Sequence, residues 1–147
     1  TPPADVYQKL IKDFSRKVEE NIGKKKSLAK TTEAMRVVYY DLAGKILETH
    51  TQVIPCYAGV SNVHINYDGG VWPCCVLGYD KEMGNLREFN YDFQKLWYSP
   101  EAKQVRKYIK EKNCACPLAN QAYSNELMHF PSLVKAGIKT IQYARKG

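Results

Sequence analysis

Five cysteines in a chain of 147 residues constrain this protein more than any other feature of its sequence. Thiols in such number form either disulfides, which are typical of small secreted scaffolds, or a thiolate site for a metal. The chain is long enough to bury a core without disulfides, and its first apolar residues are interleaved with charged ones, so we expect no secretory signal. The favoured interpretation of Cys56, Cys74, Cys75, Cys114 and Cys116 is therefore a site for zinc or an iron–sulfur cluster.

The segment around the two adjacent cysteines predicts a β-hairpin. Apolar and polar residues alternate over 63–67, and residues 68–70 (Asp-Gly-Gly) supply a turn. The return strand then carries both Cys74 and Cys75. Because neighbouring side chains of a strand point to opposite faces, we expect only one of these two cysteines to be a ligand.

Periodic apolar residues predict helices on both sides of this hairpin. Ser99 is the expected N-cap of one helix, and Pro100 is its first residue. Pro117 excludes a helix interior at the last pair of cysteines. The predicted helices cover residues 7–22, 28–49, 93–97, 100–112, 118–128 and 132–143. The expected fold class is α+β, a small β-hairpin core that binds the metal and is flanked by several α-helices.

The net charge of +7 is interpreted as solvated surface. Cations between Lys103 and Lys112 recur at spacings typical of the wet face of a helix, and residues 24–26 (Lys-Lys-Lys) form one dense run. No nucleic-acid-binding signature accompanies them, so we expect no nucleic-acid partner; a surface for docking another domain is the alternative. No stretch approaches the roughly 18 apolar residues of a membrane span, and we expect a cytoplasmic protein.

The spacing of the cysteines leaves the metal open. Zinc accepts four thiolates in a tetrahedron, and a cubane cluster accepts one thiolate at each iron. Zinc knuckles, however, usually pair their ligands as C-x(2–4)-C twice over, whereas Cys56 and Cys74 are far apart in the sequence. The residues alone therefore favour an iron–sulfur cluster over zinc.

Longer stretches around the cysteines resemble a known family. Residues 56–59 (CYAG) and 64–74 (HINYDGGVWPC) are similar to the opening of the SPASM and twitch domains, in which a glycine precedes the second cysteine by five residues. Residues 83–86 (MGNL) and 97–99 (WYS) match further landmarks of that family. The resemblance covers about residues 55–130. Such domains follow the catalytic barrel of many radical SAM enzymes.

The resemblance implies one auxiliary [4Fe–4S] cluster, as in the shorter twitch form, ligated by Cys56, Cys74, Cys114 and Cys116. The later pair is C-x-C where C-x-x-C is more usual, and the further cysteines of a complete SPASM domain are absent from the sequence. A second cluster is therefore not expected. Cys75 would be the non-ligand, a buried apolar thiol, unless it replaces Cys74.

The resemblance also implies the role of the domain. Residues 1–50 would be flanking helices, and residues 51–147 the SPASM/twitch-like domain of a radical SAM enzyme. The C-x-x-x-C-x-x-C triad that binds the SAM-cleaving cluster is absent from the sequence, so SAM would act only in the full-length enzyme. The expected partners are the barrel of the same protein and a peptide, sugar or small metabolite as substrate. The domain would transfer electrons or anchor that substrate.

Two other interpretations stay open. A zinc-stabilised module would use its basic helices to bind a protein or a nucleic acid, and a degenerate domain would bind no metal. Other candidate ligands are weaker, because His50, His64 and His129 lack metal-ligand spacing to a partner. Asp68, which precedes two glycines, is interpreted as a turn residue rather than an acid or base.

Overall fold

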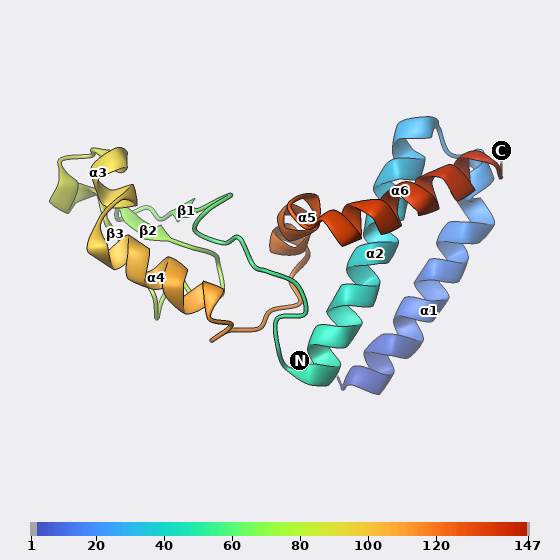
Figure 1. Cartoon of the computed structure of the whole chain (residues 1–147), viewed down its shortest axis with the longest axis horizontal. Coiled ribbons are helices and arrows are strands. Elements are labelled where there is room, and N and C mark those ends of the chain that lie inside the picture. The colour runs from blue at the N-terminus through green and yellow to red at the C-terminus, as the bar shows by residue number, and fades with distance from the viewer. Residues whose placement is uncertain (1–2, 147) are drawn as a thin grey trace. The chain divides into compact units, whose positions relative to one another are not determined.

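The chain folds as two compact units, one of which is inserted into the other in sequence (Figure 1). The computed structural model describes residues 3–146. The first unit, called the helical unit here, combines the residues up to Ile54 with those from Ala115 onward. The second, called the hairpin unit, runs from Pro55 to Cys114. This division differs from the boundary at residue 50 that the sequence suggested, because the C-terminal residues join the N-terminal helices; the domain assignment itself stays a prediction.

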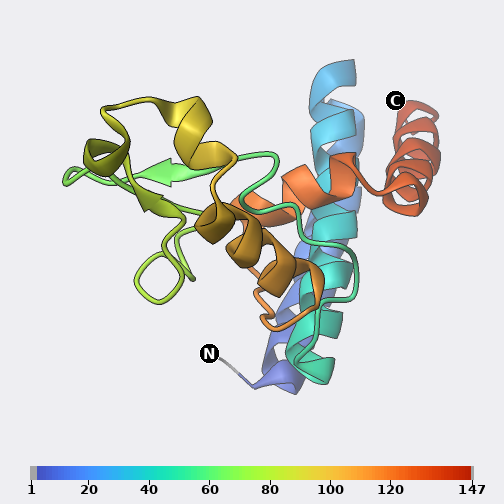
Figure 2. The same cartoon turned by 60° about the vertical axis from the view of Figure 1, so that its left-hand side comes forward.

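Helix α2 is the centre of the helical unit, since α1, α5 and α6 all contact it. Figure 1 and Figure 2 both show α1 and α2 running side by side, joined by a short turn. The elements of this unit are α1 (Ala4–Asn21), the 3-10 helix η1 (Ile22–Lys24), α2 (Ser27–Thr49), α5 (Ala119–Leu127) and α6 (Phe130–Ala144). All four α-helices were predicted, α1 and α2 from apolar periodicity and α5 and α6 as closing helices after the break at Pro117.

Two buried clusters hold the other helices against α2. Ala34, Val38 and Leu42 recur every four residues, so they lie on one face of α2. The clusters consist of Ile22, Ala34 and Tyr143, and of Val38, Leu42 and Ala136. Packing of these apolar side chains, rather than helix propensity alone, is what stabilises the helices of this unit.

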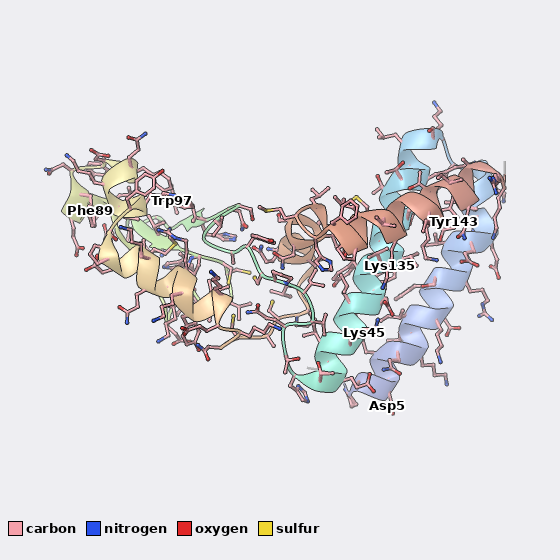
Figure 3. The ribbon with its side chains drawn as sticks, in the orientation of Figure 1. Asp5, Lys45, Phe89, Trp97, Lys135 and Tyr143 are labelled. Atoms are coloured by element: carbon pink, nitrogen blue, oxygen red, sulfur yellow. The ribbon has the colours of Figure 1, made fainter. Side chains whose placement is uncertain are left out.

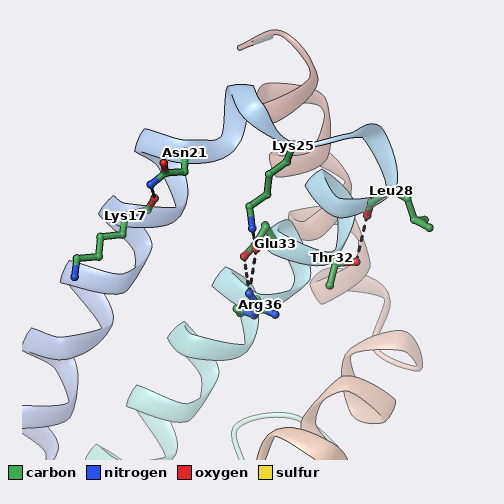
Figure 4. Close-up of polar contacts among 7 residues, drawn as sticks. All are labelled: Lys17, Asn21, Lys25, Leu28, Thr32, Glu33 and Arg36. Atoms are coloured by element: carbon green, nitrogen blue, oxygen red, sulfur yellow. Dashed lines mark hydrogen bonds and ion pairs between the residues drawn. The ribbon is translucent and has the colours of Figure 1, made fainter.

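A buried carboxylate fixes the turn between α1 and α2 (Figure 4). Glu33 is 4% exposed and accepts hydrogen bonds from Lys25 and from Arg36 Nη1, the latter at 2.9 and 3.0 Å. Lys25 lies in the turn after η1, and the other two residues lie on α2. Two cations offset the desolvation of one carboxylate, which would be costly to bury alone.

Glu126 on α5 is buried without such compensation. Its side chain is 1% exposed, and neither carboxylate oxygen has a hydrogen-bond partner among the residues that the structure describes. Burial raises the pKa of Glu126 to about 7, because desolvation disfavours the charged form. The carboxyl group is therefore mostly protonated in weakly acidic solution.

The hairpin unit contains a small antiparallel sheet with the strand order β1-β2-β3. His64 pairs with Trp72 and Ile65 with Val71, which confirms the predicted hairpin. Its elements are β1 (His64–Ile65), β2 (Gly70–Trp72), β3 (Gly84–Asn85), the 3-10 helix η2 (Leu86–Phe89), α3 (Phe93–Trp97) and α4 (Pro100–Lys110). Strand β3, which extends the hairpin on the β2 side, was not predicted.

Strand β2 is shorter than the sequence suggested. It ends at Trp72, because Pro73 has no backbone N–H to donate to a neighbouring strand. The prediction that Cys74 and Cys75 belong to the return strand is therefore wrong; both lie in the turn that follows it. The predicted turn before β2 is confirmed, with Gly69 at a φ of 92° that side chains rarely adopt.

Helix α4 covers the sheet-containing core of the hairpin unit. The predicted N-cap is confirmed, since Ser99 Oγ accepts a hydrogen bond from the Ala102 N–H at 3.1 Å and Pro100 begins the helix. Ala102, Val105 and Ile109 are buried at helical spacing. The predicted α+β class is confirmed for the chain. Among residues 3–146, no helix is both long and apolar enough to cross a membrane.

The buried carboxyl group of Glu126 predicts a stability that falls as pH rises. Between the ordinary glutamate pKa of 4.5 and about 7, the unfolded chain loses a proton that the folded chain retains, so the free energy of unfolding decreases. The full decrease is on the order of 3 kcal/mol. We expect Glu126→Gln to abolish this decrease and to stabilise the protein in mildly alkaline solution, measured by urea denaturation at a series of pH values.

Glu20→Gln, at an exposed position on α1, is the matched control and should leave the pH dependence unchanged. If Glu126→Gln and the parent chain lose stability equally with rising pH, the buried carboxyl group is not the cause.

Candidate metal centre

The loop after Cys56 is held against the segment before Cys74. Gly59 donates its N–H to the Asn62 carbonyl at 3.0 Å and to the Pro73 carbonyl at 3.1 Å. Its φ of 72° lies in the left-handed region, and a Cβ there would lie 3.2 Å from Pro73 Cβ. Glycine at this position therefore lets the two cysteine-bearing segments approach each other closely.

Cys74 and its neighbour differ in exposure. Cys74 is half-buried, and its Sγ accepts a hydrogen bond from the Leu77 N–H at 3.5 Å. Cys75 is exposed, so the prediction that it is a buried apolar thiol is wrong. The cause is the turn that begins after Pro73, which directs the second of the two thiols toward solvent.

Three of the predicted ligands border the same buried core. Cys56, Cys74 and Cys114 are each partly buried and pack against it, although they are far apart in the sequence. The core consists of Ala58, Val71, Met83, Leu96, Ala102, Val105 and Ile109. Each of these three cysteines therefore borders the same apolar core of the hairpin unit.

The last two cysteines follow the end of α4. Lys112 adopts a left-handed φ of 62° and donates its N–H to the Ile109 carbonyl at 3.0 Å, which ends the helix and redirects the chain. Cys114 is the last residue of the hairpin unit, whereas Cys116 belongs to the helical unit. Cys116 is half-buried, and its Sγ accepts a hydrogen bond from the Leu118 N–H at 3.4 Å.

Arg106 connects α4 with the Cys56 loop. Its guanidinium donates to the Trp97 carbonyl at 2.5 Å and to the Gly59 carbonyl at 3.4 Å, and it lies 4.9 Å from the centre of the Trp97 ring. Burial lowers the pKa of Arg106. The sequence had placed this residue on the solvated face of the helix. One feature of the sequence could have indicated this role: residue 106 is an arginine, whereas the other cations of the segment are lysines.

The other polar candidates have structural contacts. Asp68 Oδ1 accepts a hydrogen bond from the Gly70 N–H at 3.1 Å, which confirms its role as a turn residue. His129 Nδ1 lies 2.8 Å from Ser132 Oγ. Within residues 3–146, no three His, Cys, Asp or Glu side chains are grouped closely enough to hold a metal ion. The assignment of individual ligands therefore stays a prediction.

The family model for SPASM, an iron–sulfur cluster-binding domain, matches residues 56–117. Over these residues the chain is similar to a SPASM domain. The match begins at Cys56 and ends one residue after Cys116, so all four predicted ligands lie within it. Comparisons with curated proteins and with solved structures give no match. The resemblance seen in the sequence is confirmed, and iron–sulfur cluster binding is the function that the family indicates.

The donor atoms of this segment fit such a cluster. Cysteine thiolates are the usual ligands of iron–sulfur clusters. The N–H groups of Leu77 and Leu118 already point at the sulfur atoms of Cys74 and Cys116. Hydrogen bonds of this kind stabilise thiolates and tune the potential of a bound cluster. Cys56 packs against the apolar core of the hairpin unit.

The close approach at Gly59 predicts a specific sensitivity of the hairpin unit. Gly59→Ala should destabilise the protein by roughly 1–3 kcal/mol, because alanine is strained at this φ and its methyl group would crowd Pro73. Differential scanning calorimetry on the reduced protein measures the change.

Gly137→Ala on α6 is the matched control. A Cβ at this position has no atom within 4 Å, and alanine favours a helix, so the variant should be neutral or more stable by up to about 1 kcal/mol. Equal melting temperatures for the two variants would contradict the proposed role of Gly59.

Proposed function

We propose that this chain is the auxiliary-cluster portion of a radical SAM enzyme. Its SPASM domain would bind one [4Fe–4S] cluster through Cys56, Cys74, Cys114 and Cys116. The observation that carries the proposal is the packing of three of these cysteines against one buried core, within a segment that matches the SPASM family.

The choice of Cys74 over Cys75 rests on their surroundings. Cys74 borders the apolar core and accepts the Leu77 N–H, as expected for a thiolate that ligates a partly enclosed cluster. Cys75 is exposed. It would therefore remain a thiol beside the site.

The number of thiols supports one cluster rather than two. A [4Fe–4S] cluster uses four cysteine ligands, and the sequence contains five cysteines. Two clusters ligated only by cysteine would need about eight. A single cluster with four cysteine ligands, and with Cys75 as the non-ligand, accounts for all five cysteines.

When bound, the cluster would supply one-electron transfer at a potential set by its surroundings. Ligation by four cysteines leaves no iron open to substrate, so electron transfer is favoured over substrate anchoring. The contribution of the chain is to hold the sulfur atoms and to exclude water. Gly59 and Arg106 serve the first purpose by fixing the Cys56 loop against Pro73 and α4.

The parent enzyme would supply the rest of the catalytic machinery. SPASM domains usually accompany a radical SAM domain, and the triad that binds the SAM-cleaving cluster is absent from this sequence. The proposed partners are therefore a radical SAM barrel, SAM bound in that barrel, and a peptide, sugar or small metabolite that the barrel selects. Reduced thiols of this kind persist in the cytoplasm, where we place the protein.

The proposal predicts a difference between two adjacent cysteines. Anaerobic purification followed by iron and acid-labile sulfide analysis should give roughly four of each per chain. Cys74→Ala should lose most of this iron and its visible absorption, because a ligand is missing. Cys75→Ala, the matched control, should retain both.

Zinc without sulfide would overturn the proposal and would support a zinc-stabilised binding module. Loss of the cluster in Cys75→Ala but not in Cys74→Ala would exchange the ligand assignment.

A further inference from the structure

The helical unit carries nearly all of the excess positive charge. It contains fourteen Lys and Arg residues against eight Asp and Glu, whereas the hairpin unit contains eight against seven. Cluster binding by the SPASM domain gives no reason for this asymmetry. An excess of one sign on one unit favours a partner of the opposite sign.

A groove of about 900 Å³ lies within the helical unit, between α1, α2 and α6. Its floor is apolar, with Val37 and Val38 buried and Ile11 half-buried beside them. Ile138 of α6 lines the groove and is 52% exposed, so it has no complete apolar cover. Apolar surface in a concave site is a usual mark of a binding site.

Charged side chains line this groove, with cations in excess. The cations are Lys12, Arg16, Lys45, Lys135 and Lys139, and the carboxylates are Glu19, Asp41 and Glu48. Asp41 is already paired with Lys45 at 3.0 Å, and Glu48 accepts a hydrogen bond from α1. In the described part of the chain, no carboxylate forms an ion pair with Lys12 or Lys135. Figure 3 labels Lys45 on α2 and Lys135 on α6.

We propose that this groove binds an acidic amphipathic helix of a partner protein. Residues 8–19 of α1 and 37–48 of α2 line it, and each run is about 17 Å long, which matches three turns of a third helix. Helix-in-groove recognition combines apolar anchors with complementary charges beside them. Ile138 and the half-buried Ile11 receive the anchors, while Lys12 and Lys135 meet the carboxylates.

Other occupants use these features less well. An anionic membrane is flat and would leave the concave floor uncovered, and a nucleic acid would satisfy the lysines but not the apolar floor. A second copy of the chain would bring the same positive excess to the contact. A convex helix with apolar and acidic faces uses both the floor and the lysines.

Fluorescence anisotropy with two synthetic helical peptides tests the inference on the whole chain. One labelled peptide has a leucine face flanked by glutamates, and the other has lysine in place of every glutamate. We expect the acidic peptide to bind at least about tenfold more tightly, and added salt to reduce the difference. Lys135→Glu and Ile138→Asp should each weaken its binding about tenfold.

Lys103→Glu on α4 is the matched control, since it makes the same charge change on an exposed residue of the hairpin unit. Its binding should stay within about twofold of the parent chain. Circular dichroism establishes that each variant is folded. Equal binding of the two peptides, equal weakening by Lys103→Glu, or binding to phosphatidylserine vesicles but not to the acidic peptide would each overturn the inference.

Discussion

The stability of the hairpin unit depends on a small core, because the unit has sixty residues and its core consists of seven buried apolar residues. Units of this size bury little apolar surface, and natural examples often add a disulfide or a metal as a further link. Cys56 and Cys114 stand near the two ends of this unit, and Cys74 follows its hairpin. Ligation of these thiols would therefore join its ends to its middle, which ties the stability of the fold to the cofactor.

The helical unit handles two buried glutamates in opposite ways. Glu33 has two cationic partners and serves as a fixed link between a turn and α2. The carboxylate oxygens of Glu126 have no hydrogen-bond partner among the described residues. Protonation instead reduces the free-energy cost of burying this carboxyl group. The first arrangement stabilises a connection, whereas the second leaves a weak point whose cost depends on the solution.

Features set by neighbouring residues were predictable from the sequence, and features set by distant contacts were not. Apolar periodicity, the Ser99 cap and the break at Pro117 predicted the helices, and the family resemblance predicted the similarity to SPASM over residues 56–117. The four ligands that it implies stay a prediction. Strand β3 has only two residues and no alternation, so its pairing with β2 alone makes it a strand. The exposure of Cys75 and the contacts of Arg106 likewise depend on how remote segments pack.

The insertion of one unit into the other also affects the order in which the two units can fold. Leu42 of α2 and Ala136 of α6 share a buried cluster, yet the whole hairpin unit separates them along the chain. During synthesis from the N-terminus, α2 is complete long before α6 leaves the ribosome, whereas the contacts of the hairpin unit close within a shorter stretch. The inserted unit therefore has the opportunity to fold first. Until α6 is synthesised, the apolar face of α2 that packs against it stays exposed.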